Sequence, residues 1–519
     1  MAVVASFSAH ILSLAVPLAL VQAYDRLIPN QAYATTFLLG FGVLLAIIGE
    51  AVLRYGRSIL FANIGAVFES RMTLRVLNHV MQSESRHVHG LGTPVLSDAL
   101  RAVTAARDNW TGSAAAGLHE LPFVVIYIAL IGYIGGWLAL IPFLLTIAAL
   151  AAAYYVSRSA MEVAQEVNAA EIHQRSLLWG IFGGIVEVKT MAAEAIMTRQ
   201  YRDAVAETLE THARQDSSAT LIRENGHLLG QLSTILIVGF GAGMIIDGTL
   251  TTGGLAACSL IAGRSIAPAM SAFSYLNQRS RRNEAEQKIE EVLSLPLAPL
   301  WQGSGERMFT GGEIRLAGEA VAGGEATIPF GRIVRIDAPD PLTETAVLHA
   351  VARLDDALGL TVSYDGLPGI AYDSVSLKHH IALANATTPL VTGTLLDNLT
   401  LFSPQYEPDA LRMAQRLGLD SFVDSLPDGL MTPVGAVGAE IVSQGLTVRI
   451  GLIRALVRRP AILCLDHIGG ALDLDGTKRL MEVLRQLKGH ITILICSNNP
   501  TMLELADQTV RIERRVVHG

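Results

Sequence analysis

The chain has 519 residues, of which 51% are hydrophobic and 17% charged, with a formal net charge of −8. This length exceeds what one hydrophobic core serves, so at least two domains are expected. Soluble domains carry about 25% charge, so the deficit indicates membrane-spanning segments, and the mild acidity argues against a nucleic-acid partner. The three cysteines, Cys258, Cys464 and Cys496, are too widely spaced for a zinc site or a disulfide framework, so no metal site is expected.

Six stretches in the first half are apolar over about 20 residues, the length that a helix needs to cross a bilayer. They are Ser6–Ala23, Thr35–Leu53, Leu118–Gly135, Trp137–Val156, Leu228–Ile246 and Gly253–Leu276. The first could be taken for a signal peptide, but no Lys or Arg precedes its apolar run, so we expect it to be retained. The sequence therefore predicts a six-span membrane domain over residues 1–293.

The segments that join these stretches differ in length and charge. Residues 54–116 and 157–226 are long and rich in arginine, whereas the other connections carry almost no basic residue. By the positive-inside rule the long segments and both termini are cytoplasmic. Their apolar residues recur every three or four positions, which favours helices that extend the spans; two small cytoplasmic domains are the alternative.

One charged residue, Arg264, falls inside the last apolar stretch. A charge at that depth is costly unless it faces a polar interior. Arg264 is therefore a candidate for contacting a substrate along a translocation path, and a packing or snorkelling arginine is the alternative. Near the cytoplasmic ends, Gly92–Leu96 and Trp179–Gly184 are candidate turns for transmitting motion to the membrane.

The pattern changes after a proline-containing linker at residues 294–307. From residue 308 to residue 519, short apolar runs alternate with helical segments, which predicts an α/β domain with a largely parallel sheet. These runs are Ile333–Ile336, Ile381–Ala384, Ile462–Leu465 and Ile491–Ile495.

Two features of this second domain suit nucleotide chemistry. A buried strand that ends in Asp466 is how a nucleotide-hydrolysing sheet presents a carboxylate to magnesium. Upstream, Ser443 and Gly445 precede a predicted helix over Thr447–Arg458. A hydroxyl and backbone N–H groups at a helix N-terminus can be directed at a phosphate.

The order of these motifs resembles the cassette domain of ABC exporters. It is carried by Pro427–Gly435, Val442–Leu446, Ala461–Asp466 and Ala471–Asp473, while Gly92–Ala99, Val188–Glu194 and Asp247–Gly253 resemble the membrane half of bacterial type I secretion exporters. The resemblance implies a six-span helical domain of the type I ABC exporter fold, followed by an α/β P-loop-type cassette. It also implies ATP and Mg as cofactors, a lipid environment in the bacterial inner membrane, and protein or peptide export with a periplasmic adaptor and an outer-membrane channel.

The stretch after the first cassette strand departs from the family's phosphate loop, G-x-x-x-x-G-K-[ST]. Ala338 and Thr343 stand at the glycine positions, Glu344 at the lysine position and Thr345 at the Ser/Thr position. Asp337, Asp340 and Glu344 add negative charge where a triphosphate would lie. Pro339 and Pro341 lack the N–H groups that would cradle it. We therefore predict a degenerate Walker A segment.

Three further positions agree with this interpretation. The family's glutamine is replaced by Ala386, its catalytic glutamate by His467 and its switch histidine by Asn498. No catalytic residue is intact, whereas Ser443, Gly445 and Asp473 are kept. The pattern favours a half-transporter that completes the ATP site of a catalytic partner in a heterodimer, although Gln444 replaces a glycine. The alternatives are a membrane scaffold or sensor without ATPase activity, and an enzyme that uses His467 as base.

Overall fold

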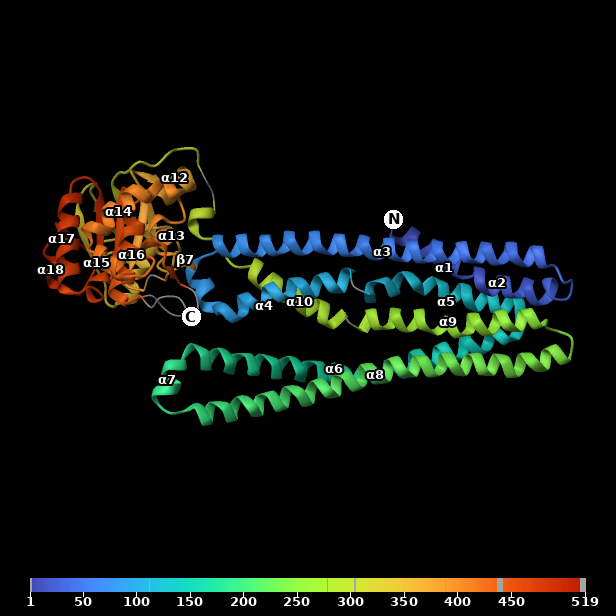
Figure 1. Cartoon of the computed structure of the whole chain (residues 1–519). Helices are drawn as coiled ribbons and strands as arrows, with labels where there is room; N and C mark the ends of the chain where they lie inside the picture. Colours follow the sequence, from blue (N-terminus) through green and yellow to red (C-terminus); the bar gives the residue numbers. More distant parts are fainter. Residues whose placement is uncertain are drawn as a thin grey trace. The chain divides into compact units, whose positions relative to one another are not determined.

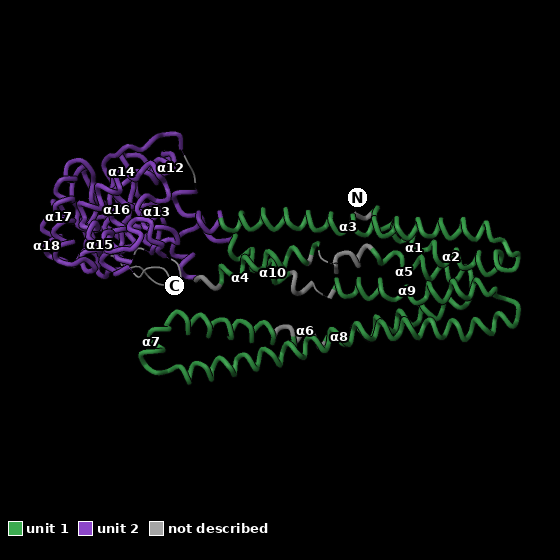
Figure 2. Tube along the Cα trace, viewed as in Figure 1, with its two compact units in different colours: residues 1–77, 92–293 green, residues 78–91, 294–519 purple. Residues whose placement is uncertain are grey.

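The computed structural model describes residues 2–111, 113–277, 279–302, 305–387, 389–435 and 442–513. The chain forms two compact units, shown in Figure 2. Unit 1 comprises residues 1–77 and 92–293, and unit 2 comprises residues 78–91 and 294–519. Residues 78–91 therefore pack with the C-terminal unit, although they lie within the N-terminal half of the chain.

Unit 1 is helical throughout its regular structure, and its helices run side by side along one axis (Figure 1). Helix α6 returns as α8 through the short α7 at one end of this unit. The helices are α1 (Ala2–Ser13), α2 (Ala15–Gln22), α3 (Tyr33–Gln82), α4 (Ser85–Thr111), α5 (Ser113–Gly135), α6 (Leu140–Gly183), α7 (Ile185–Thr190), α8 (Glu194–Ile246), α9 (Thr252–Asn277) and α10 (Arg279–Leu293).

Five helical segments of the described residues are long and apolar enough to cross a membrane, so the expected count of six is not confirmed. They are Val4–Leu27, Tyr33–Gln82, Glu120–Arg158, Glu194–Ile246 and Thr252–Leu276. The difference arises at Glu120–Arg158, which covers two of the predicted stretches and contains the 3-10 turn Gly136–Ala139.

The chain reverses at this turn. A Cβ added to Gly132 would lie 3.5 Å from the Cβ of Ala139. Seven residues of straight helix would separate the two positions by about 10 Å. Gly136 adopts φ +57°, a left-handed conformation that glycine tolerates well. The 39 residues of this segment therefore do not form one straight helix.

The interior of unit 1 is built where α5, α8 and α9 meet. Tyr127 and Ile131 of α5 pack in one buried cluster with Ile237 of α8 and Ile261 of α9. By contrast, α3 exposes large apolar side chains along its length, including Phe37 and Leu38 at 80% and 69% exposure. Apolar faces of this extent are suited to lipid rather than water.

Unit 2 is an α/β domain, as the sequence predicted. Its central sheet is parallel, with strand order β11-β3-β10-β9-β6, and a second, antiparallel sheet has the order β2-β1-β4-β5. The strands are β1 (Ile314–Ala317), β2 (Glu325–Ile328), β3 (Ile333–Asp337), β4 (Thr361–Tyr364), β5 (Leu367–Pro368), β6 (Ile381–Asn385), β7 (Gly393–Thr394), β8 (Pro433–Val434), β9 (Ile462–Asp466), β10 (Thr492–Cys496) and β11 (Gln508–Arg511).

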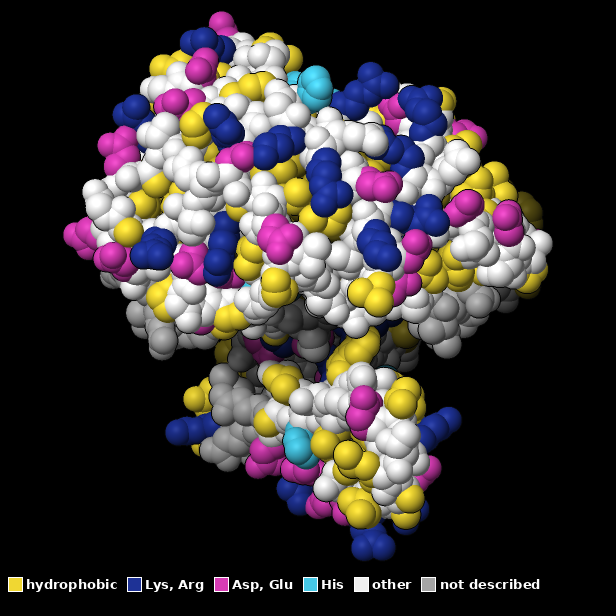
Figure 3. Space-filling view, turned by 90° about the vertical axis from the view of Figure 1, so that its left-hand side faces the viewer, with side chains coloured by type: hydrophobic (Ala, Val, Ile, Leu, Met, Phe, Trp, Pro, Cys, Tyr) yellow, Lys and Arg dark blue, Asp and Glu magenta, His cyan; other side chains and the backbone are white. Residues whose placement is uncertain are grey.

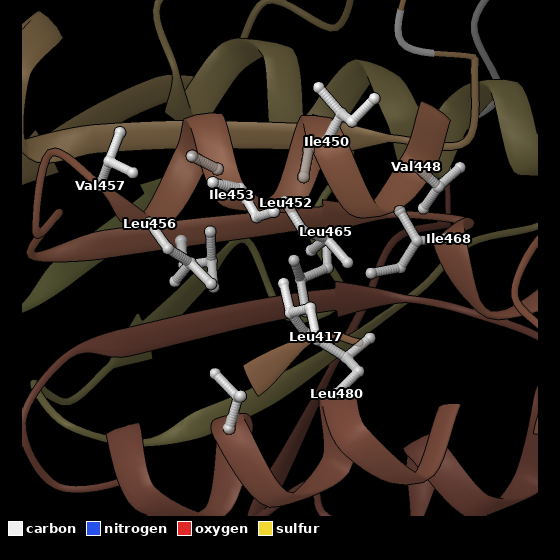
Figure 4. Packing of buried hydrophobic residues seen from close by; sticks show 14 of the residues in the cluster. Leu417, Val448, Ile450, Leu452, Ile453, Leu456, Val457, Leu465, Ile468 and Leu480 are labelled. Carbon is white, nitrogen blue, oxygen red and sulfur yellow. The ribbon is translucent and has the colours of Figure 1, made fainter. Parts of the chain in front are cut away.

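Successive residues of the central strands point to opposite faces, as the pleat requires. Ile493 and Ile495 of β10 belong to one core cluster, whereas Leu494 and Cys496 belong to another. In the first cluster, α16 packs Leu452 and other residues against β9 and α17 (Figure 4). The helices of unit 2 are α11 (Pro341–Val351), α12 (Ser374–His380), α13 (Leu395–Thr400), α14 (Glu407–Arg416), α15 (Asp420–Ser425), α16 (Gln444–Leu456), α17 (Leu474–Leu487) and α18 (Pro500–Leu503).

Candidate functional site

The candidate site lies at the carboxyl ends of the parallel strands, where ligands of open α/β sheets bind. Asp466 ends β9 and is paired in register with Asn385 of β6 and Cys496 of β10. The backbone N–H of Ala386 donates to the Asp466 carbonyl at 3.2 Å, and that of His467 donates to the Cys496 carbonyl at 2.9 Å. The sheet therefore brings together Ala386, Asp466 and His467, three residues that the sequence analysis singled out.

The loop between β3 and α11 is satisfied by its own side chains. Asp340 is the N-cap of α11, and its carboxylate accepts from the Thr343 backbone N–H at 2.9 Å and from the Thr343 hydroxyl at 3.0 Å. Pro341 follows as the first helical residue, where its missing N–H has no consequence. At the start of α11, the Thr343 N–H is therefore already bonded to a carboxylate of the chain itself.

Glu344, at the family's lysine position, is buried with 7% exposure. Its Oε1 accepts a long hydrogen bond of 3.4 Å from the Ala338 N–H, and its Oε2 lies 3.2 Å from His467 Nε2. Burial raises the pKa of the Glu344 carboxyl, while the Ala338 N–H and His467 partly offset that effect. Two of the replaced positions, 344 and 467, thus contact each other.

Thr345 keeps a geometry that suits magnesium. Its hydroxyl donates to Asp466 Oδ1 at 2.8 Å, and Asp466 is itself buried. A hydroxyl beside a carboxylate at these positions is the pair that P-loop proteins use to hold the metal ion. Among the described residues, however, no group of three or more His, Cys, Asp or Glu side chains is arranged to hold a metal on its own.

Asp337, which the sequence analysis counted as a negative charge against a triphosphate, is paired with arginines in the structure. The carboxylate of Asp337 lies 2.7 Å from Arg335 Nη2 and 3.9 Å from Arg511 Nε. Asp337 therefore adds less negative charge to the loop than its position suggested, because arginines on β3 and β11 face it. The other two acidic residues of the loop are Asp340, which caps α11, and Glu344, which lies beside His467.

The N-cap of α16 differs from that of α11, whose Asp340 side chain accepts a capping hydrogen bond. Ser443 is its N-cap, is exposed, and makes no side-chain capping hydrogen bond. The helix begins at Gln444, three residues before the predicted start, and Gln444 is also exposed. A Cβ on Gly445 would lie 3.2 Å from the Ala471 carbonyl oxygen, so glycine permits the close approach of the turn before α17. Residues 436–441, just before this motif, lie outside the described residues.

Asp473 is engaged within its own chain. Its Oδ1 accepts from the Gly476 N–H at 2.7 Å, as the N-cap of α17, and from Arg449 Nη2 at 2.6 Å. The Gly476 N–H and Arg449 together lower the pKa of the Asp473 carboxyl. The side chain stays 67% exposed, so one edge of the carboxylate faces outward.

The sequence analysis assigned no role to Arg449, which lies on α16 and pairs with Asp473 at the start of α17. Its guanidinium is buried and donates from Nη1 to the Leu417 and Gly418 carbonyls at 3.2 and 2.9 Å. An arginine at the second position of the otherwise largely apolar run Val448–Leu456 was the signal that could have identified it.

Two other predicted positions are not part of this cluster of contacts. Asn498 follows β10 and is exposed. Arg264 is exposed on α9 of unit 1, and it does not line the cavity of about 530 Å³ between α8 and α9. That cavity is lined on α8 by Arg223, His227 and Gln231, among others. These polar residues of α8 are better placed than Arg264 to contact a molecule there.

The surface of the cassette carries mixed charge on the face shown in Figure 3. Lys and Arg side chains are interspersed with Asp and Glu, and neither sign forms a continuous patch on that face. Nucleic-acid-binding proteins usually present a continuous basic stripe or patch.

Comparisons with known proteins agree on the class. The family of the ABC transporter transmembrane region matches residues 1–266. The chain is 24% identical to "Cyclolysin secretion/processing ATP-binding protein CyaB" of Bordetella pertussis, over 97% of this chain and 72% of that protein. It is 23% identical to "Type I secretion system ATP-binding protein PrsD" of Rhizobium meliloti, over 97% and 88% of the two chains.

A third relative is "Alpha-hemolysin translocation ATP-binding protein HlyB" of Escherichia coli, 21% identical over 98% of this chain and 74% of that protein. Among solved structures, a bacterial Atm1-family ABC exporter with ATP bound superposes with a TM-score of 0.81 at 16% identity, covering 98% of this chain and 92% of the other. That likeness shows the fold. The chain therefore belongs to the ABC transporter transmembrane family, and it has the exporter fold of a helical membrane domain followed by an α/β cassette.

Proposed function

We propose that this chain is one half of an ATP-driven exporter and that its cassette serves a catalytic partner rather than its own nucleotide site. The observation that carries the proposal is the Glu344 carboxylate in the phosphate loop, 3.2 Å from His467 Nε2. A like-charge contact between a carboxylate and a phosphate costs several kcal/mol at intermediate dielectric, on the order of 4 kcal/mol at 4 Å. Tight ATP binding by this loop is therefore disfavoured.

Each half-transporter in this proposal supplies six membrane crossings, with both termini in the cytoplasm. Residues 1–293 form the membrane domain, residues 294–307 the linker and residues 308–519 the cassette. The reversal at Gly136–Ala139 supports two crossings within the segment Glu120–Arg158. The arginine-rich cytoplasmic segments support the orientation.

The partner's ATP, with its Mg, would lie against Ser443, Gly445 and Asp473 of this chain. The exposed Ser443 hydroxyl supports this role, because it makes no capping hydrogen bond at the start of α16 and helix N-termini favour anions. The Gln444 side chain is exposed beside them and would have to turn away from the phosphate. In the chain's own site, Thr345 and Asp466 would be the residues left to hold a metal, without a phosphate loop to accompany them.

The relatives suggest the cargo and the location. Their names refer to secretion of cyclolysin, translocation of alpha-hemolysin and a type I secretion system. We extend from them a protein or peptide substrate, a periplasmic adaptor with an outer-membrane channel, and residence in the bacterial inner membrane. The polar wall of the α8–α9 cavity supports a path for cargo through unit 1.

The experiment is ATP hydrolysis by this chain co-reconstituted with a candidate partner in proteoliposomes. We expect Ser443→Ala to lower the turnover by about tenfold or more, since single oxyanion donors contribute factors of that size. The matched control is Ser425→Ala on α15, an exposed serine whose hydroxyl donates to the nearby Phe422 carbonyl. Unchanged turnover with Ser443→Ala would contradict the proposed role.

A second candidate function is a membrane scaffold or sensor that has the exporter fold but no ATPase activity. Asp473 caps α17 and pairs with Arg449, and both contacts stabilise the fold without any nucleotide. A structural role for Asp473 favours this second function. In that case the Ser443 substitution and its control would behave alike with every partner. Turnover by this chain alone that His467→Ala abolishes would instead support an unorthodox ATPase.

A further inference from the structure

Residues 78–91 comprise the end of α3, the connecting residues Ser83 and Glu84, and the start of α4, and they belong to unit 2 by their contacts. The Ala298 N–H donates to the Gln82 carbonyl at 2.8 Å, and the Glu84 N–H donates to the Pro296 carbonyl at 3.0 Å. Ser83 and Leu297 form an antiparallel bridge between them. The segment is thus attached to the start of the cassette chain by backbone hydrogen bonds, as a short two-stranded contact.

A buried carboxylate joins this segment to the cassette core. Asp355 is only 3% exposed, and its Oδ2 accepts from the Ser85 hydroxyl at 3.0 Å. The same oxygen lies 2.8 Å from His349 Nδ1. Burial alone would raise the pKa of Asp355, but the bonds with His349 and Ser85 outweigh it and hold that pKa below its usual value.

The end of α11 explains why Asp355 reaches His349. The Arg353 N–H bonds the Ala350 carbonyl at 3.0 Å, and the Leu354 N–H bonds the His349 carbonyl at 2.9 Å, which is the Schellman pattern of a helix end. Arg353 has φ +53° at the position that glycine usually occupies. Its guanidinium donates to the Pro299 carbonyl, so the unusual residue is held in place from the linker side.

His349 also connects this point to the candidate site. It lies on α11, the helix that begins at the phosphate-loop segment and carries Glu344 and Thr345 in its first turns. The rise from Thr345 to His349 is about 6 Å, little more than one helical turn. Because one short helix holds both ends, a displacement of the loop residues carries His349 with it.

We propose that Asp355 is a positioning residue that couples the phosphate-loop helix α11, through His349, to the membrane-derived segment 78–91, through Ser85. Both partners share the single oxygen Oδ2, so a movement of α11 either moves Ser85 or breaks one of the two bonds. The coupling gives the half-transporter proposed above a route from cassette to membrane helix. Its test uses neither nucleotide nor partner, and its outcome is therefore independent of that proposal.

The test is hydrogen–deuterium exchange of the full chain in lipid nanodiscs. In Ser85→Ala we expect amides of residues 83–88 to exchange about fivefold faster, the change that corresponds to one hydrogen bond of about 1 kcal/mol. We expect a comparable increase in residues 344–350, across the joint from the substitution. Ser85→Thr keeps the hydroxyl and should restore both regions.

The matched control is Ser83→Ala, whose hydroxyl donates to the His79 carbonyl at 2.7 Å and not to Asp355. It should leave residues 344–350 unchanged. Faster exchange in 83–88 alone after Ser85→Ala would overturn the proposal, because the serine would then act only locally.

A double substitution tests whether Ser85 acts through Asp355. In an Asp355→Asn background, Ser85→Ala should add little to the exchange of residues 344–350, because the shared oxygen is already changed. Fully additive effects of the two substitutions would contradict the coupling. The neighbouring Asp356→Asn, whose carboxylate caps the Leu360 N–H at 2.9 Å, should leave the Ser85 effect intact.

Discussion

Two helix starts in the cassette are built in opposite ways. The start of α11 is filled by its own side chains: Asp340 accepts from Thr343, and the Glu344 carboxylate lies beside His467. At the start of α16, Ser443 is exposed and makes no side-chain capping hydrogen bond. Helix N-termini attract anions, so the Asp340 carboxylate competes with phosphate at the first, whereas no carboxylate of the described residues caps the second. Under the proposed function, this difference separates a site that does not serve the chain's own nucleotide from a surface offered to a partner's nucleotide.

The largest expected effect concerns Arg449, the buried arginine of α16. Arg449→Ala should lower the free energy of unfolding of the cassette by about 3 kcal/mol, because it strands the Leu417 and Gly418 carbonyls and removes the partner of Asp473. Hydrogen exchange of the β9 and β10 amides in the full chain would measure it.

The control is Arg459→Ala, which removes an arginine that is 77% exposed and paired with Asp409. Exposed ion pairs contribute about 0–1 kcal/mol, so its effect should be small. Equal effects of the two substitutions on the free energy of unfolding would mean that Arg449 does not stabilise the packing of α16 against α17. The account of how the start of α16 is supported would then be contradicted.

A second prediction concerns the pH dependence of stability that Glu344, at the start of α11, contributes. Burial raises the pKa of Glu344, so its charged form is disfavoured in the fold. The stability contributed by the protonated form is present below the ordinary pKa and is lost as pH rises through the raised value. Glu344→Gln should therefore stabilise the cassette more at about pH 8 than at about pH 4, by roughly 1–2 kcal/mol, the cost of an unsatisfied buried group.

Exchange of the α11 amides at both pH values would test this, with Glu325→Gln on β2 as the exposed control. Glu325 is half-exposed and paired with Arg315 at the edge of the other sheet. If Glu344→Gln destabilises the cassette at the higher pH, the Glu344–His467 pair is a net stabilising contact and not a buried charge under strain.

The smallest expected effect is at the cap of α11. Asp340→Ala removes the acceptor for the Thr343 N–H and should lower the free energy of unfolding by about 1 kcal/mol, whereas Asp340→Ser keeps an acceptor and should change it little. Exchange of the Thr343 and Glu344 amides measures the difference. Identical behaviour of the alanine and serine variants would show that the cap does not hold the closed loop.

The sequence was sufficient to predict what depends on local pattern. Short apolar runs that alternate with helices predicted the parallel sheet. Ala386 and His467 were assigned by their place in the family's motifs, and in the structure they lie beside Asp466 because parallel strands end at one edge. Spacing from the strand assigned Thr345 to the Ser/Thr position, and the structure adds its hydrogen bond to Asp466.

What could not be predicted depends on contacts between distant residues. The Glu344–His467 pair requires His467 at φ 51°, a conformation that no local pattern signals for histidine. Arg449 and Asp473 lie on different helices, and their pairing follows from how α16 and α17 pack. The count of six spans is not confirmed, because Glu120–Arg158 forms one apolar segment that the 3-10 turn Gly136–Ala139 divides where the sequence separated two stretches.

The most direct test of the central claim is a titration of the full chain in nanodiscs with a fluorescent ATP analogue and Mg. We expect no saturable binding below about 1 mM, because Glu344 and Asp340 take the place of the anion. Glu344→Lys should bind more tightly than the unaltered chain if the loop geometry is otherwise kept. Saturable binding by the unaltered chain at micromolar concentrations, abolished by Asp466→Asn, would contradict the closed site.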